Sequence, residues 1–268
     1  MGFDLDAYLE RIGLSGVEPD AAGLRALQEA QMRSIPFENF DPLLGKVPDL
    51  GLGEIFAKTV PGGRGGYCFE HNLLFEAALG AVGFPVRRML ARVRMRGDNS
   101  APRSHLALQV EAEGRSFLAD AGFGGPGSLG PLELGVEGEQ ETPSGVFRLV
   151  ADTETGETVL EARSGVGWVQ LYGFDVAHVS EGEIAAANYA CATWDQAPFG
   201  FHAMLGSYSG DARYGVFDRN LTVSRLECEE RREFADFEDF AAVVKGEMGI
   251  GLDSATLQRA WDKIGGVG

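Results

Sequence analysis

The feature that most constrains the fold is a change in hydrophobic period near Pro85. Before this residue, apolar side chains recur at spacings of three and four, which is typical of amphipathic helices. From Val86 onward, apolar and polar residues largely alternate, as they do where a strand buries one face. Helices followed by strands, without regular alternation of the two, predict an α+β fold rather than a parallel sheet.

The helical part spans residues 1–83 and contains three clear segments. Asp4 and Asp20 precede two of them and can cap their first turns, because an aspartate side chain accepts hydrogen bonds from free N–H groups there. The third segment covers residues 68–83, where Gly83 provides a stop signal. We therefore expect the first third of the chain to be helical.

The strands that follow are short and are separated by turn signals. Leu106, Leu108 and Val110 repeat the alternation. Further strands are expected at residues 115–120, 145–151, 157–163 and 167–173 and, after a loop rich in glycine, serine and aromatic residues, at 215–225. Many short strands of this kind are typical of a small barrel or sandwich. The chain then returns to helix, with apolar stripes that include Phe240 and Trp261.

The composition limits the partners and the location of the chain. Its 268 residues carry a net charge of −17, which argues against a nucleic-acid partner, because binding to phosphate backbones needs a basic surface. No apolar run approaches the roughly 20 residues of a membrane span, and the acidic N-terminus does not resemble a signal peptide. We therefore expect no membrane association and a cytoplasmic location. Three cysteines without an export signal are expected to be free thiols.

Cys68 is the first candidate for chemistry, because it stands where a glycine-rich turn meets a helix. Unpaired N–H groups and the positive end of the helix dipole favour a thiolate at such a position. The neighbouring glycines leave room for a substrate carbonyl and for backbone donors to a developing oxyanion. The alternative is a buried structural cysteine, which is common on helices.

A base for Cys68 must come from the four histidines, of which two are suitably placed. His71 follows by three residues and can reach the sulfur along one helix face. His105 lies on the less apolar face of a strand, from which it can point into a cleft. Each can equally be a satisfied interior or surface histidine, so the sequence pattern leaves both open.

Asp120 strengthens the case for His105. It closes the strand that follows His105, and the intervening EAEG turn predicts that the two strands are hairpin neighbours. A carboxylate there can hold an imidazole in the correct tautomer, although it can also serve the backbone of the next loop. Cys68, His105 and Asp120 together predict a nucleophile, a base and an orienting acid. The cysteines and histidines lack zinc-ligand spacing, so we expect no metal.

Several blocks around these residues resemble the arylamine N-acetyltransferases. They are IPFENFDPLLG (35–45), RGGYCFEHN (64–72), SHLAL (104–108) and DAGFGG (120–125), with weaker likeness in APFGFHAM (197–204) and DRNLTV (218–223). The resemblance implies a cysteine-protease-like core in three parts. These are an N-terminal helical bundle with Cys68 (1–84), a central antiparallel β-barrel with His105 and Asp120 (85–196) and a C-terminal α/β lid (197–268).

The resemblance also implies an activity and its binding residues. Acetyl-CoA would be the cosubstrate, and its acetyl group would pass through a thioester on Cys68 to a small aromatic amine, hydroxylamine or hydrazine. The residues implied to line the acceptor pocket are Phe37, Phe69 and Phe123, each of which can instead be core packing. Those implied to meet CoA are Gly124, Gly125, Ser128 and Phe199. The protein is expected to be a monomer or a homodimer.

Two other functions fit the same three residues. One is an amide synthase of a polyketide pathway, which would release an acyl chain from a carrier protein, although an acidic surface does not favour docking of an acidic carrier. The other is a thiol hydrolase of the transglutaminase or protease type, which would pass the acyl group to water. A member that only binds CoA or small aromatics is disfavoured, since the three chemical residues are intact.

Overall fold

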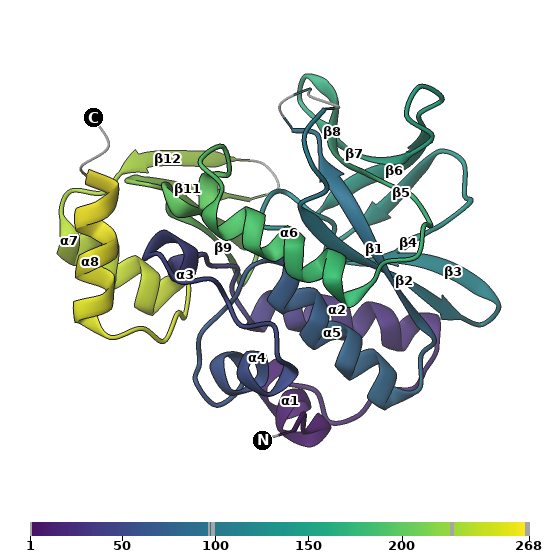
Figure 1. Cartoon of the computed structure of the whole chain (residues 1–268), viewed down its shortest axis with the longest axis horizontal. Coiled ribbons are helices and arrows are strands. Elements are labelled where there is room, and N and C mark those ends of the chain that lie inside the picture. The colour runs from purple at the N-terminus through teal and green to yellow at the C-terminus, as the bar shows by residue number, and fades with distance from the viewer. Residues whose placement is uncertain (1, 96, 98–99, 226–227, 266–268) are drawn as a thin grey trace.

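The computed structural model describes residues 2–95, 97, 100–225 and 228–265. Its N-terminal part consists of helices (Figure 1): α1 (Leu5–Ile12), α2 (Ala21–Ser34), α3 (Phe40–Leu43), α4 (Leu52–Thr59) and α5 (Cys68–Val82). The predicted caps are confirmed, because Asp4 Oδ1 accepts from Ala7 N at 3.1 Å and Asp20 Oδ1 accepts from Gly23 N at 2.7 Å. Gly83 ends α5 in the left-handed conformation, at a φ of 110°.

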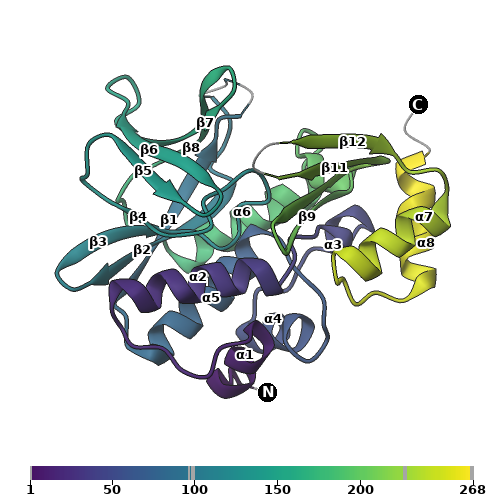
Figure 2. The same cartoon turned by 180° about the vertical axis from the view of Figure 1, so that it is seen from behind.

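The central part is an eight-stranded antiparallel sheet that curls into a barrel-like shape (Figure 2). Its order is β4-β3-β2-β1-β8-β7-β6-β5. The strands are β1 (Val86–Val93), β2 (His105–Ala112), β3 (Arg115–Ala119), β4 (Leu132–Glu133), β5 (Glu139–Thr142), β6 (Gly145–Ala151), β7 (Thr158–Ser164) and β8 (Gly167–Phe174). The predicted hairpin between β2 and β3 is confirmed, with Leu108 opposite Ala119.

The C-terminal part combines a second sheet with helices (Figure 1). The sheet order is β12-β11-β10-β9, formed by β9 (Met204–Ser209), β10 (Ala212–Phe217), β11 (Asn220–Ser224) and β12 (Glu229–Glu233). The helices are α7 (Phe237–Ala242), which continues into a π-helical turn (Val243–Glu247), and α8 (Ser254–Gly265). Helices, an antiparallel sheet and a mixed end confirm the predicted α+β class.

Three local predictions in this region were wrong. The expected strand 215–225 is two strands, because the chain reverses at Asp218, which has a φ of 52°. The stretch that contains β9 was expected to be a loop. Helix α6 (Glu181–Thr193) was not expected, since its buried stripe includes the polar Asn188 and therefore lacks a clear apolar period.

The buried clusters cross the predicted boundaries at residues 84 and 196. Phe40 and Leu43 from the helical part pack into the C-terminal core. Ile184 and Cys191 of α6 pack into the core between the N-terminal helices and the sheet. The division into three separate domains therefore stays a prediction. None of the helices in the described ranges has the length and apolar character needed to cross a membrane.

Candidate active site

Cys68 is the first residue of α5, and a close backbone approach fixes the turn before it. A Cβ at Gly65 would overlap the carbonyl oxygen of Pro36, so the chain can pass there only as glycine. Glu70 Oε2 then accepts a hydrogen bond from Tyr67 N at 3.1 Å, which stabilises the start of the helix. The side chain of Cys68 is buried, with 4% of the residue exposed.

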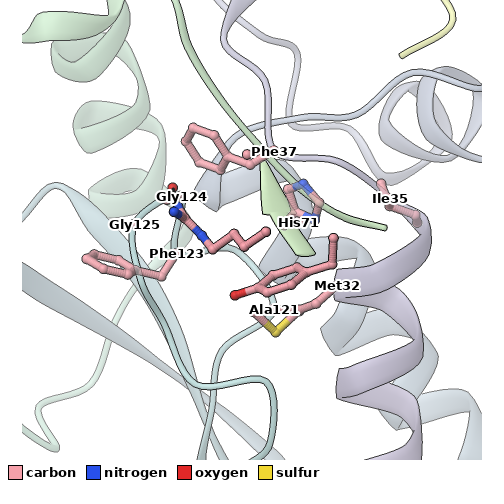
Figure 3. Close-up of a pocket in the computed structure, with 11 residues that line it drawn as sticks. Met32, Ile35, Phe37, His71, Ala121, Phe123, Gly124 and Gly125 are labelled. Carbon is pink, nitrogen blue, oxygen red and sulfur yellow. Dashed lines mark hydrogen bonds between the residues drawn. The ribbon is translucent and has the colours of Figure 1, made fainter. Parts of the chain in front are cut away.

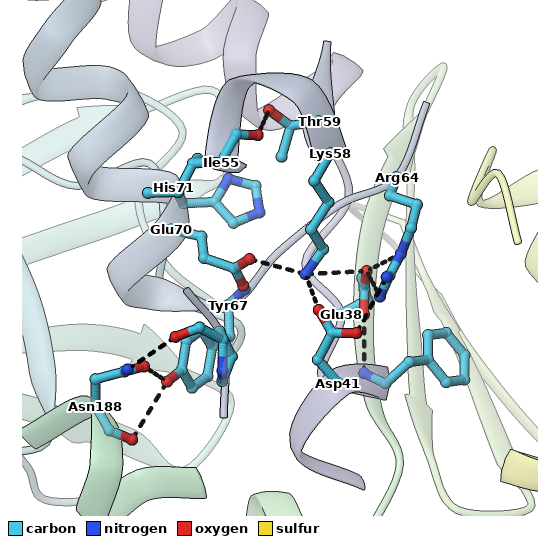
Figure 4. A network of polar contacts seen from close by, with 12 residues as sticks. Glu38, Asp41, Ile55, Lys58, Thr59, Arg64, Tyr67, Glu70, His71 and Asn188 are labelled. Atoms are coloured by element: carbon cyan, nitrogen blue, oxygen red, sulfur yellow. Dashed lines mark hydrogen bonds and ion pairs between the residues drawn. The ribbon is translucent and has the colours of Figure 1, made fainter. Parts of the chain in front are cut away.

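A group of buried and partly buried charges holds this turn against the rest of the helical part (Figure 4). Lys58 Nζ lies 2.8 Å from both Glu70 Oε1 and Asp41 Oδ2. Arg64 Nη2 lies 2.7 Å from Glu38 Oε1, and its Nη1 lies 3.1 Å from Asp41 Oδ1. Burial lowers the pKa of Lys58, but the surrounding carboxylates outweigh burial and raise it above its ordinary value. The turn that presents Cys68 is therefore anchored by a network of ion pairs.

His105 and Asp120 meet as the sequence predicted. His105 Nε2 lies 2.7 Å from Asp120 Oδ2, and both residues are buried. Since Nε2 is engaged by the carboxylate, Nδ1 is the nitrogen left for Cys68, whose thiol interacts with the imidazole. Sγ itself donates to the backbone oxygen of Ser104, the residue before His105, at 3.8 Å. The structure thus brings the three residues together from the start of α5, the start of β2 and the end of the β3 hairpin.

Burial and neighbouring charges act in opposite directions on this pair. Burial lowers the pKa of His105, but the charge and hydrogen bond of Asp120 outweigh it and raise the pKa to about 10. Burial also raises the pKa of the Cys68 thiol, whereas the interaction with His105 lowers it. The helix start was expected to favour the thiolate. Burial opposes the thiolate and keeps the pKa of the thiol above its ordinary value, and His105 is the neighbour that acts most strongly in the thiolate's favour.

Two residues that the sequence analysis did not single out complete the surroundings of Asp120. Asn72 Nδ2 donates to Asp120 Oδ1 at 2.9 Å, and the hydroxyl of Tyr172 donates to Oδ2 at 2.9 Å. Burial raises the pKa of Asp120, but its partners, led by His105, lower it below its ordinary value. Asn72 lies one helical turn after Cys68, so its spacing in the sequence could have predicted that it faces the same site. Tyr172 comes from β8, and no local pattern connects it with Asp120.

A pocket of about 290 Å³ lies beside these residues (Figure 3). Four of the predicted binding residues line this pocket: Phe37, Phe123, Gly124 and Gly125. Phe123 also joins the pocket to His105, because the two rings pack edge to face with their centroids 5.3 Å apart. The rest of the wall is formed by Met32, Ile35, His71, Ala121, Gly206, Tyr208 and Arg213.

The other predicted binding residues lie outside this pocket. Phe69 is fully buried and packs edge to face on Tyr67. Ser128 is buried at a separate pocket of about 220 Å³, where its hydroxyl donates to Gly130 O at 2.6 Å. Phe199 is half-buried, and its ring centroid lies 6.4 Å from that of Phe37. The geometry therefore offers no support for substrate contacts by Phe69 or CoA contacts by Ser128.

His71, the alternative base, has other partners. Its Nε2 lies 3.0 Å from Pro36 O, and its ring stacks on Phe37 with an interplanar angle of 8°. Burial lowers the pKa of His71 to about 4, so the ring is neutral at physiological pH. His71 is therefore engaged elsewhere, and His105 is the histidine whose charge acts on the Cys68 thiol. Across the described residues, no group of three or more histidine, cysteine, aspartate or glutamate side chains could hold a metal ion.

Known proteins share both the sequence and the fold. A family model described as N-acetyltransferase matches residues 20–257. An arylamine N-acetyltransferase of Mycolicibacterium smegmatis is 35% identical over 260 residues, which cover 94% of this chain and 94% of that protein. One of Escherichia coli is 33% identical and covers 94% of this chain and 90% of that protein.

Solved structures agree over almost the whole chain. The arylamine N-acetyltransferase of Salmonella typhimurium superposes with a TM-score of 0.91 at 30% identity, covering 98% of this chain and 99% of that one. That of Mycobacterium marinum in complex with CoA superposes with a TM-score of 0.92 at 30% identity, covering 97% and 99%. The resemblance seen in the sequence blocks is therefore confirmed, and this chain belongs to the arylamine N-acetyltransferase family.

Proposed function

We propose that this protein transfers the acetyl group of acetyl-CoA to an arylamine, an arylhydroxylamine or a hydrazine through a thioester on Cys68. The observation that carries the proposal is the buried hydrogen bond of His105 with Asp120, next to the buried thiol of Cys68 and a pocket with aromatic walls. Membership of the arylamine N-acetyltransferase family and the likeness to a relative solved with CoA support the choice of both substrates.

In the first half-reaction, Cys68 reacts as the thiolate while His105 holds the proton. The sulfur attacks the acetyl carbonyl carbon, the bond from that carbon to the CoA sulfur breaks, and His105 donates its proton to the departing thiolate. One thioester replaces another, so the step is close to isoenergetic. The burial of Cys68 keeps water away from the acetyl group until an acceptor binds.

In the second half-reaction, the acceptor nitrogen attacks the thioester carbon. Neutral His105 accepts a proton from that nitrogen, and the bond to Cys68 breaks and returns the sulfur as the thiolate. The greater stability of the amide drives the step. Asp120 holds Nε2 of His105, which keeps Nδ1 directed at the sulfur, and Tyr172 and Asn72 hold the carboxylate in turn.

The pocket suggests how the two substrates are bound. Phe37 and Phe123 would form the walls for the acceptor ring. The backbone N–H groups near Gly124 and Gly125 would receive the CoA phosphates, and Phe199 would contact CoA beside Phe37. We leave Phe69 and Ser128 out of the proposed contacts, because both are buried with partners of their own.

Incubation with acetyl-CoA and no amine tests the proposal. Intact-protein mass spectrometry with peptide mapping should find one acetyl group on Cys68, which an added arylamine should remove as the acetylated amine. The Cys68→Ala variant should take up none. Cys191→Ala is the matched control, because the Cys191 thiol is also buried and lies 3.4 Å from Ser104 O, the same oxygen that faces Cys68 Sγ at 3.8 Å.

The same incubation separates the competing functions. Rapid release of acetate without an amine would identify a thiol hydrolase. Labelling by a long acyl thioester but not by acetyl-CoA would identify an amide synthase. Acetylation that persists in Cys68→Ala would contradict the proposed nucleophile.

A further inference from the structure

The proposed reaction makes no use of His71, although this residue lies in the wall of the pocket. Its ring is buried, with 2% of the residue exposed, and Nδ1 has no hydrogen-bond partner within the described residues. A buried polar atom without a partner is uncommon, because the loss of its hydration is not compensated. Because His71 lines the pocket, a molecule bound there can supply the missing partner.

The tautomer of His71 follows from its other nitrogen. Nε2 lies 3.0 Å from Pro36 O, and a carbonyl oxygen can only accept, so Nε2 carries the hydrogen. Burial keeps the ring neutral, since it lowers the pKa to about 4. Nδ1 therefore presents a lone pair and can only accept a hydrogen bond. The stacking of the ring on Phe37 holds it in this orientation.

The pocket that His71 lines offers few hydrogen-bond donors of its own. Met32, Ile35 and Phe37 give this part of the wall an apolar character (Figure 3). Arg213 also lines the pocket, but its Nη2 donates to Gly124 O at 2.9 Å. A trapped water would itself need two or more polar partners.

We propose that His71 Nδ1 selects the acceptor substrate by accepting a hydrogen bond from a second donor on it. The favoured class is then arylamines and aryl hydrazines that carry an additional O–H or N–H group apart from the reacting nitrogen. This inference rests on the proposed acetyl transfer. An acceptor without that donor leaves Nδ1 desolvated and unpaired, and should react slower by about tenfold or more.

Single-turnover discharge of the acetyl-enzyme tests the inference with matched acceptors. The enzyme is first acetylated with acetyl-CoA, freed of CoA and then mixed with one amine. Para-aminophenol carries the donor, para-toluidine matches its size, and para-anisidine matches the electron donation of its ring. The meta isomers are run in parallel. Aminophenol in at least one isomeric series should discharge the acetyl group about tenfold faster than both analogues.

The His71→Phe variant removes the acceptor and keeps an aromatic ring against Phe37. It should lose the preference for aminophenol, leaving the three amines within about twofold of one another. Tyr208→Phe is the matched control, because it removes a hydroxyl from the same pocket, and it should keep the preference. Equal rates in the unmodified enzyme, or an unchanged preference in His71→Phe, would overturn the inference.

Two further readouts keep the test decisive. The acetylation step reports on the proposed function alone, so a protein that forms no acetyl-enzyme fails there and not at His71. If His71→Phe does not fold, ¹⁵N-labelled histidine in the unmodified protein replaces it. Phenol, but not anisole, should shift the Nδ1 resonance of His71 upfield, and an identical response to both would also overturn the inference.

Discussion

Asn72 Nδ2 lies 2.9 Å from Asp120 Oδ1, and this hydrogen bond joins the helix that begins with Cys68 to the hairpin that begins with His105. The same amide group donates to Leu106 O at 2.6 Å, and its Oδ1 accepts from Ala121 N at 3.0 Å. One buried side chain therefore sets the distance between a helical layer and a sheet. Reaction geometry across two layers depends on such a contact, because small displacements of reacting groups cost large factors in rate.

Replacement of Asn72 by Leu should slow acetylation of Cys68 by about a hundredfold, since the two layers lose their common hydrogen bonds. Stopped-flow release of CoA measures this step. Gln109→Leu is the control, because Gln109 lies on β2 and its side chain bonds only to Glu111 and Ser116 among the described residues. Equal rates for the two variants would show that Asn72 does not position the reacting groups.

His105→Gln should raise the pKa of the Cys68 thiol, because burial would no longer be opposed by the imidazolium. The rate of alkylation by iodoacetamide should then rise only at higher pH than in the unmodified protein, and at neutral pH it should fall by about tenfold or more. His71→Phe should leave the profile in place. A shift in His71→Phe and none in His105→Gln would make His71 the base.

Asp120→Asn should lower kcat by roughly a thousandfold to ten-thousandfold, since an amide can hold His105 in the wrong tautomer. Tyr172→Phe keeps the carboxylate and removes one of its hydrogen bonds, so its effect should be much smaller. Steady-state acetylation of para-anisidine measures both variants. An Asp120→Asn effect no larger than that of Tyr172→Phe would reduce Asp120 to a structural role.

Lys58→Met should lower the free energy of unfolding by about 3–5 kcal/mol, because it leaves the buried carboxylate of Glu70 without its cation, whereas Glu38 keeps its ion pair with Arg64. Urea denaturation measures the loss. The matched control is Arg163→Met, which breaks a surface ion pair with Glu139 and should cost no more than about 1 kcal/mol. Similar midpoints for both variants would contradict the structural role of the buried cluster.

The stability of the protein should fall as the pH is lowered from 6.5 toward 4. Over this window His71 stays neutral in the folded chain, where burial lowers its pKa to about 4, but becomes protonated in the unfolded chain. The unfolded state binds the additional proton, so acid favours unfolding. Thermal melts of His71→Phe should show a smaller decline than the unmodified protein across the same window. Parallel declines would show that His71 makes no contribution.

The order of helices and strands, the aspartate caps and the pairing of His105 with Asp120 were predictable, because each depends on residues that are close along the chain. Caps act within one turn, and a hairpin brings its two strands together through a short connection. The blocks around Cys68, His105 and Asp120 are also continuous in the sequence, so the family resemblance could be seen in them without the structure.

The tertiary structure decided the rest. It placed Tyr172 of β8 on Asp120, paired β9 with β10, and turned α6 toward the helical core through a stripe that includes Asn188. It also buried Phe69, and it placed His71 in the wall of the pocket rather than as the base for Cys68. These outcomes depend on contacts between segments far apart in the chain. Their energies come from burial and from pairing across layers, which a local pattern of residue types does not encode.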